Sequence, residues 1–145
     1  MPWQIQRTYF SLVKAFASRD SIKILKYSAD LGHYIGDAHV PLHTTANHNG
    51  QLTNQVGIHA FWESRLPELF ASNYNFVVGK AKYIENHLKE AWKIVKHTHS
   101  LVDTVLTLEA TLAAAFPSDK KYSFSERNNT VLKQFSVEYS KTYHD

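Results

Sequence analysis

The chain of 145 residues contains no cysteine. This absence excludes disulfide bonds, thiolate metal sites and thiol catalysis. No apolar run approaches the roughly 20 residues that cross a bilayer as a helix, and the first residues lack the basic start and apolar stretch of a signal peptide. The net charge is only +3, without a dense tract of lysine and arginine of the kind that binds nucleic acid. The chemistry of this chain must therefore rest on other side chains.

Proline and glycine are also scarce, and most of them fall between residues 32 and 67. Elsewhere the apolar residues recur at helical spacing, and an alternation with period two, typical of strands, is missing. The pattern predicts an all-α fold, a helical bundle that forms a single domain over residues 1–145, with one structured loop at 44–55. The predicted helices are 3–18, 21–38, Val56 to just before Pro67, one long helix over 86–116, and a last helix opened by a capping box at Ser123 and Glu126 that runs through Tyr139.

Histidine, in contrast, is abundant: the chain has nine. Between residues 33 and 63, two histidines each precede an acidic residue by four positions, a spacing that places both side chains on one face of a helix. These pairs are His33 with Asp37 and His59 with Glu63, and His43 follows Pro41 in the segment between them. Without cysteine, imidazole and carboxylate are the ligands that zinc takes in proteins.

Three protein ligands plus an open position for water are typical of a catalytic zinc site. His43, His59 and Glu63 would supply such a set. The alternative is that these residues are hydrogen-bonded core histidines and ordinary helix-surface pairs.

Several neighbouring residues have two interpretations. His39 either supports a metal ligand or is solvated, and either Phe61 or Trp62 belongs to the core while the other could contact substrate. Asn47, Asn54 and Gln55 could line a cleft, although loops commonly carry such residues. His48 is expected to be exposed, and the remaining histidines, at 87, 97, 99 and 144, are expected to be ordinary helix or terminal residues.

Three short runs carry a resemblance to a known family: His33-Tyr34-Ile35-Gly36-Asp37, Pro41-Leu42-His43 and His59-Ala60-Phe61-Trp62-Glu63. Together they resemble the zinc-dependent phospholipase C and S1/P1 nuclease superfamily over about residues 24–70. The loop NGQLTNQVGIH is more similar to the bacterial phospholipase C-like branch than to the nucleases. The resemblance implies an all-α bundle of the phospholipase C/P1 nuclease type that holds up to three zinc ions.

The resemblance also implies roles for individual residues. His43, His59 and Glu63 would bind one zinc ion, while His33 and Asp37 would belong to a paired-zinc site in which Asp37 bridges the two metals. The family takes its other ligands, and the aspartate that activates water, from upstream positions. This chain has no histidine before His33. We therefore expect a fold that lacks the family's N-terminal helices, a piece of a domain about twice as long, with only the His43/His59/Glu63 site complete.

The function implied is hydrolysis of phospholipid phosphoesters. The alternatives are a single-strand-specific nuclease and a truncated, metal-stabilised helical module without catalysis. The partners would be a phosphoester substrate, either a phospholipid head group or single-stranded nucleic acid, and a second copy of the chain bound through apolar surface that the missing helices leave exposed. By resemblance the protein would be secreted or periplasmic.

Overall fold

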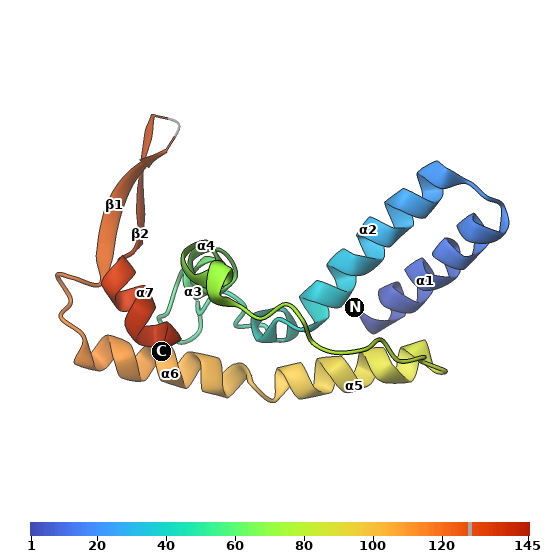
Figure 1. Ribbon diagram of the computed structural model, residues 1–145. Coiled ribbons are helices and arrows are strands. Elements are labelled where there is room, and N and C mark those ends of the chain that lie inside the picture. Colours follow the sequence, from blue (N-terminus) through green and yellow to red (C-terminus); the bar gives the residue numbers. More distant parts are fainter. Residues whose placement is uncertain (128) are drawn as a thin grey trace. The chain divides into compact units, whose positions relative to one another are not determined.

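The computed structural model describes residues 1–127 and 129–145, and it is mostly helical with one small two-stranded sheet (Figure 1). The chain forms two compact units, and each of them combines two separate stretches of sequence. Unit 1 contains Met1–Thr45 and Lys80–Val102, and unit 2 contains Ala46–Gly79 and Asp103–Asp145. The predicted predominance of helix is confirmed, but the prediction of a fold without strands is wrong. None of the helices in the described ranges has the length and apolar character needed to traverse a membrane.

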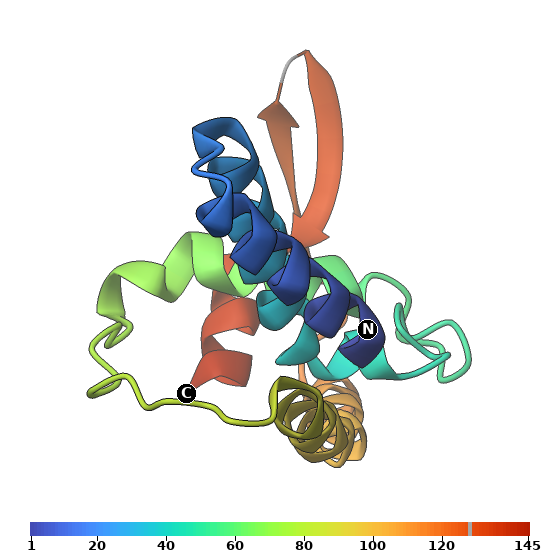
Figure 2. The same cartoon turned by 90° about the vertical axis from the view of Figure 1, so that its right-hand side faces the viewer.

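Unit 1 is built on two helices that lie side by side and run in opposite directions (Figure 1, Figure 2). The N-cap Asp20 begins the second of them, because its side chain accepts a hydrogen bond from the Lys23 amide at 3.0 Å. A third helix packs on both, around a small core of Ile5, Ala38 and Ala91. The elements of unit 1 are α1 (Pro2–Ala17), α2 (Ser21–Ala38), the 3-10 helix η1 (Pro41–Thr44) and α5 (His87–His99).

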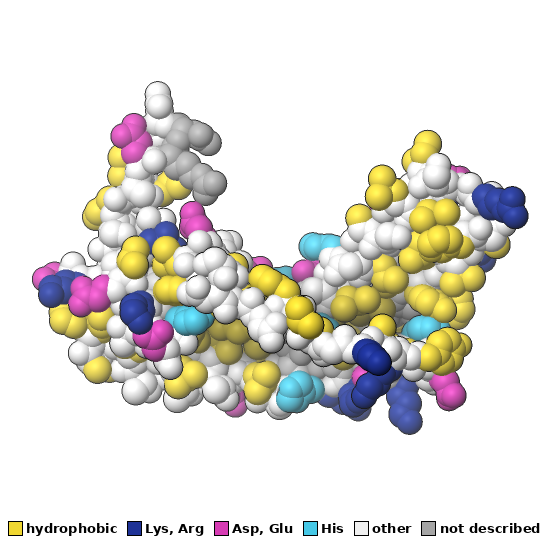
Figure 3. Space-filling model, in the orientation of Figure 1, with side chains coloured by type: hydrophobic (Ala, Val, Ile, Leu, Met, Phe, Trp, Pro, Cys, Tyr) yellow, Lys and Arg dark blue, Asp and Glu magenta, His cyan; other side chains and the backbone are white. Residues whose placement is uncertain are grey.

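The α1–α2 pair carries large apolar side chains that remain exposed, among them Phe10, Phe16, Ile22 and Leu25. Figure 3 shows hydrophobic side chains, in yellow, gathered over these two helices. Leu25 keeps 74% of its surface in solvent. The predicted dimerisation through apolar surface stays a prediction.

Unit 2 has its core around Phe61, which is 1% exposed. The Phe61 ring lies 4.3 Å from that of Phe135 and 5.9 Å from that of Tyr139, measured between ring centres. These three rings join segments that are more than 70 residues apart in the sequence. The elements of unit 2 are α3 (Ile58–Ala60), the π-helical turn η2 (Phe61–Arg65), α4 (Leu66–Phe70), the 3-10 helix η3 (Ala71–Asn73), α6 (Val102–Ala115), β1 (Tyr122–Arg127), β2 (Thr130–Phe135) and α7 (Val137–His144). The first residue of α6, Val102, is counted with unit 1.

Pro67 does not end the third predicted helix. Helical backbone continues from Ile58 through Phe70, because the π-helical turn η2 precedes the proline. The Leu66 amide donates to the Phe61 carbonyl, five residues earlier. Pro67 then occupies the first turn of α4, where its missing amide hydrogen is tolerated.

The long helix predicted over 86–116 is two helices, α5 and α6. The Ser100 hydroxyl donates to the His97 carbonyl at 2.7 Å, and the Leu101 amide donates to the Thr98 carbonyl three residues earlier. A serine that bonds to nearby backbone competes with the helical ladder. The break therefore falls at residues 100 and 101, inside an unbroken apolar pattern.

The last predicted helix, over Ser123–Tyr139, is mostly a β-hairpin. β1 and β2 pair antiparallel, with Ser123 opposite Gln134, and residue 128 of the predicted helix lies outside the described residues. Asn129 has a left-handed φ of 58°, a conformation that asparagine adopts in hairpin turns. The N-cap of α7 is Ser136, whose hydroxyl accepts a hydrogen bond from the Tyr139 amide at 3.1 Å.

Candidate metal centre

In unit 1, three of the predicted ligands lie together. Asp37 faces two imidazoles: its Oδ2 is 3.3 Å from His33 Nε2, and its Oδ1 is 3.5 Å from His43 Nδ1. The i,i+4 spacing on α2 produces the first contact, as predicted. The His43 side chain is 23% exposed and that of His33 70%. Each oxygen of the Asp37 carboxylate therefore faces a different histidine.

The segment after α2 gives His43 a defined position. Pro41 and Leu42 are buried, and the His43 amide donates to the Val40 carbonyl at 3.1 Å. Pro41 ends regular α-helix here, as predicted, because α2 stops at Ala38 and η1 begins at Pro41. His43 is therefore carried by a short, anchored 3-10 turn.

In unit 2, His59 and Glu63 also pair. Nε2 of His59 is 3.2 Å from Oε2 of Glu63, and both side chains are a little over one quarter exposed. Nδ1 of His59 lies 3.3 Å from the backbone carbonyl oxygen of His48. A carbonyl oxygen can only accept, so this contact is a hydrogen bond in the tautomer that carries the hydrogen on Nδ1. In that tautomer the lone pair of Nε2 is directed toward Glu63.

The contact between His59 and Glu63 indicates whether these two side chains could hold a metal ion. A neutral Nε2 and a carboxylate oxygen are both acceptors, and they need a proton on Nε2 or a shared cation to lie this close. A backbone carbonyl that fixes the other ring nitrogen is the usual support of a metal-binding histidine. Glu63 also lies in the π-helical turn η2, and such turns are frequent at functional sites. The geometry of this pair is compatible with metal binding.

The predicted set divides between the units, with His43 in unit 1 and His59 and Glu63 in unit 2. By donor chemistry, two imidazoles and one carboxylate, these three residues could hold a metal ion.

Other residues named from the sequence have mainly structural contacts. The exposed His39 uses Nδ1 toward the Ile35 carbonyl, 2.8 Å away and one turn earlier, which agrees with the solvated interpretation. His48 is exposed as predicted, but its carbonyl orients His59. Phe61 is the core residue of the Phe61–Trp62 pair.

Two further histidines contact neighbours within unit 1. The His87 ring stacks on Tyr9, with 3.7 Å between ring centres. His99 Nδ1 lies 3.2 Å from the hydroxyl of Thr44, the residue that follows His43 in the chain. The sequence-based prediction treated His99 as an ordinary helix residue and missed this contact.

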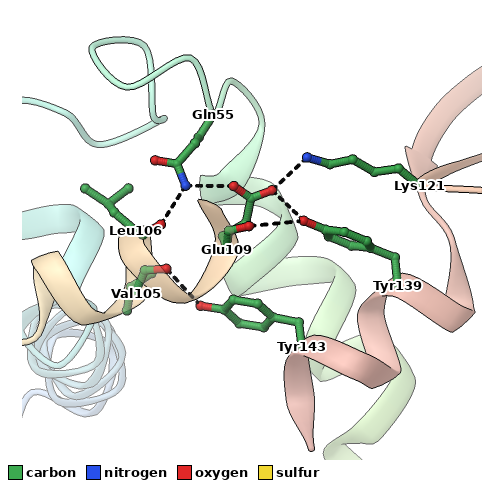
Figure 4. Close-up of polar contacts among 7 residues, drawn as sticks. All are labelled: Gln55, Val105, Leu106, Glu109, Lys121, Tyr139 and Tyr143. Carbon is green, nitrogen blue, oxygen red and sulfur yellow. Dashed lines mark hydrogen bonds and ion pairs between the residues drawn. The ribbon is translucent and has the colours of Figure 1, made fainter. Parts of the chain in front are cut away.

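A buried carboxylate that the sequence-based prediction also missed lies at the centre of unit 2 (Figure 4). Glu109 is 1% exposed. Its Oε1 accepts from Lys121 Nζ at 2.9 Å and from the Tyr139 hydroxyl at 2.7 Å, and its Oε2 accepts from Gln55 Nε2 at 2.7 Å. The Gln55 amide also donates to the Leu106 carbonyl at 2.8 Å. The signal that could have revealed Glu109 is its place in the middle of the apolar helix α6, whose other acid, Asp103, lies in the first turn.

The contacts of Glu109 define its charge. Burial favours the neutral acid, but the hydrogen bonds from Lys121, Gln55 and Tyr139 outweigh burial and hold the pKa of Glu109 below its ordinary value of 4.5. Burial and the bond to Glu109 together raise the pKa of Tyr139. Burial also raises the pKa of Tyr143 to about 12, and its hydroxyl donates to the Val105 carbonyl at 3.3 Å. Glu109 is therefore an ionised, hydrogen-bonded group that ties three segments together.

No protein family, curated protein or solved structure matches this chain in comparisons with known proteins.

Proposed function

We propose that this chain is a zinc-dependent phosphodiester hydrolase of the phospholipase C type. The observation that supports it most is that histidine nitrogens lie 3.2–3.5 Å from carboxylate oxygens within each unit. In unit 1 His33 and His43 contact Asp37, and in unit 2 His59 contacts Glu63. Such donors favour zinc in a chain without cysteine. The resemblance of the three short runs to zinc-dependent phosphoesterases supplies the reaction class.

The proposed roles follow the donor sets. His43, His59 and Glu63 would hold one zinc ion, and His33 and Asp37 would contribute to a paired site. Bound zinc would polarise a phosphoryl oxygen and lower the pKa of its water toward neutrality. The His48 carbonyl would keep the proton of His59 on Nδ1, so that Nε2 stays available as a ligand.

Zinc content is the first test. We expect about one zinc ion per chain after dialysis against metal-free buffer, for the His43/His59/Glu63 site. Glu63→Gln should lower the bound zinc, whereas Glu68→Gln, the same change on an exposed side chain one turn later, should not. A chain that binds no zinc even after zinc is added would refute the proposal.

Hydrolysis of bis(p-nitrophenyl) phosphate by the zinc-loaded chain is the second test. Activity that falls in Glu63→Gln and persists in Glu68→Gln would support the hydrolase. Zinc binding without any hydrolysis would instead favour the metal-stabilised module without catalysis.

One observation favours the nuclease alternative. A cavity of about 300 Å³ in unit 2 is lined largely by aromatic rings, and Trp62 precedes the proposed ligand Glu63 in the chain. Aromatic rings at such a site can stack on unpaired bases. The lining residues are Trp62, Leu66, Pro67, Tyr74, Tyr143 and His144. Parallel assays with phosphatidylcholine vesicles and with single-stranded DNA would separate the two substrates, and Trp62→Ala should reduce only cleavage of DNA.

A further inference from the structure

Residues 46–57, which we call the 46–57 loop, are held by their own side-chain amides. The Asn47 side chain, 7% exposed, accepts from the Leu52 amide at 2.8 Å. The Asn49 side chain accepts from the Gly57 amide at 3.1 Å. These bonds close the loop on itself, but they do not attach it to the rest of unit 2.

Gln55 attaches the loop to α6. Its side-chain amide donates to Glu109 and to the Leu106 carbonyl on α6 (Figure 4). Glu109 is buried and ionised, and a bond to a charged group is about twice as strong as one between neutral groups. Gln55 thus links the 46–57 loop to a buried carboxylate that also accepts hydrogen bonds from Lys121 and Tyr139.

The backbone of Gln55 continues the connection toward His59. Its carbonyl accepts from the Ile58 amide at 3.1 Å, at the start of the helical segment that carries His59. Its amide donates to the Gly50 carbonyl at 2.8 Å, and Gly50 follows His48 by two residues. A displacement of Gln55 would therefore move both His59 and the carbonyl that orients it.

We propose that the Gln55–Glu109 hydrogen bond positions the metal ligand His59, by holding the 46–57 loop so that the His48 carbonyl keeps the proton on Nδ1. Gln55 is in this sense a positioning residue that does not touch the metal. The proposal rests on the proposed function, because it takes His59 as a zinc ligand.

The chain offers a matched pair of variants to test it. Gln55→Met and Lys121→Met each remove one donor from Glu109 and replace it with an unbranched apolar side chain. Only Gln55 belongs to the loop. Lys121 lies directly before β1, so its loss weakens the same carboxylate network from the other side.

Three measurements on the full chain compare the variants. Zinc affinity is measured by competition with a chromophoric chelator. Hydrogen exchange of the Leu52 and Gly57 amides reports closure of the loop, and the ¹⁵N shifts of the His59 ring report which nitrogen carries the proton. We expect Gln55→Met to weaken zinc binding by roughly tenfold, the lower end of the effect of lost outer ligand contacts. It should also speed both exchange rates and mix the His59 tautomers, while Lys121→Met changes zinc affinity less than about threefold.

Equal effects of the two variants on zinc affinity, amide exchange and His59 tautomer would overturn the proposal, because Gln55 would then act only through overall stability. If the parent chain binds no zinc, the proposed function fails. The exchange rates and the ring shifts, measured without metal, then still decide whether Gln55 positions His59.

Discussion

Replacing Glu109 with glutamine tests the buried carboxylate. The carboxylate accepts three hydrogen bonds, from Lys121, Tyr139 and Gln55. A glutamine has one oxygen acceptor, so its NH₂ group must face at least one of these donors. Lys121, whose side chain is 19% exposed, also loses its ion-pair partner. Breaking a buried ion pair on one side costs about 3–5 kcal/mol, and we expect Glu109→Gln to lower the free energy of unfolding by that amount.

Urea denaturation followed by circular dichroism measures this loss, and its pH dependence identifies the cause. The pKa of Glu109 is lower in the folded than in the unfolded chain, so its stabilisation is present above pH 4.5 and is lost as the pH falls through the folded pKa. Glu109→Gln should lack that part of the acid-side loss. If Glu109→Gln does not fold, Tyr139→Phe removes one donor and should cost about 1.5–3 kcal/mol. A change below about 1 kcal/mol in both variants would refute the reasoning.

Three further changes test other features. Gly50→Ala places a Cβ against the Gln55 carbonyl oxygen at a φ of +72°, so it should cost more than about 1 kcal/mol in urea denaturation; an unchanged midpoint would contradict the described loop conformation. Phe61→Ala empties the core beside Phe135 and should cost about 3–5 kcal/mol by the same assay, whereas a loss under about 1 kcal/mol would show that this core is not close-packed. Leu25→Lys, on the exposed apolar face of α1 and α2, should reduce the dimer fraction in light scattering, and a parent chain that is already monomeric would disprove the dimer prediction.

Local spacing was sufficient to predict several features. The first two helices follow from apolar periodicity, and they begin and end within one residue of the prediction. The contact between His59 and Glu63 follows from a spacing of four residues on a helix. In both cases the deciding interactions join residues at most one turn apart.

The failures involve interactions that spacing does not encode. Ser123 and Glu126 match a capping box, yet pairing with the strand that ends at Phe135 places both in a β-hairpin. The Gln55–Glu109 bond joins residues 54 positions apart, so Gln55 was indistinguishable from an ordinary polar loop residue. A buried acid finds its partners only after the chain has folded, and a single sequence does not name them.

The interleaving of the two units has a consequence for folding on the ribosome. The chain passes from one unit to the other three times, after Thr45, Gly79 and Val102. The α1–α2 pair is synthesised before α5, but the core of unit 1 requires Ala91 of α5. By then His59 and Glu63 have already been synthesised. Every proposed metal ligand in this chain is therefore translated before either core is complete, so the ligands are made while both units still lack part of their cores.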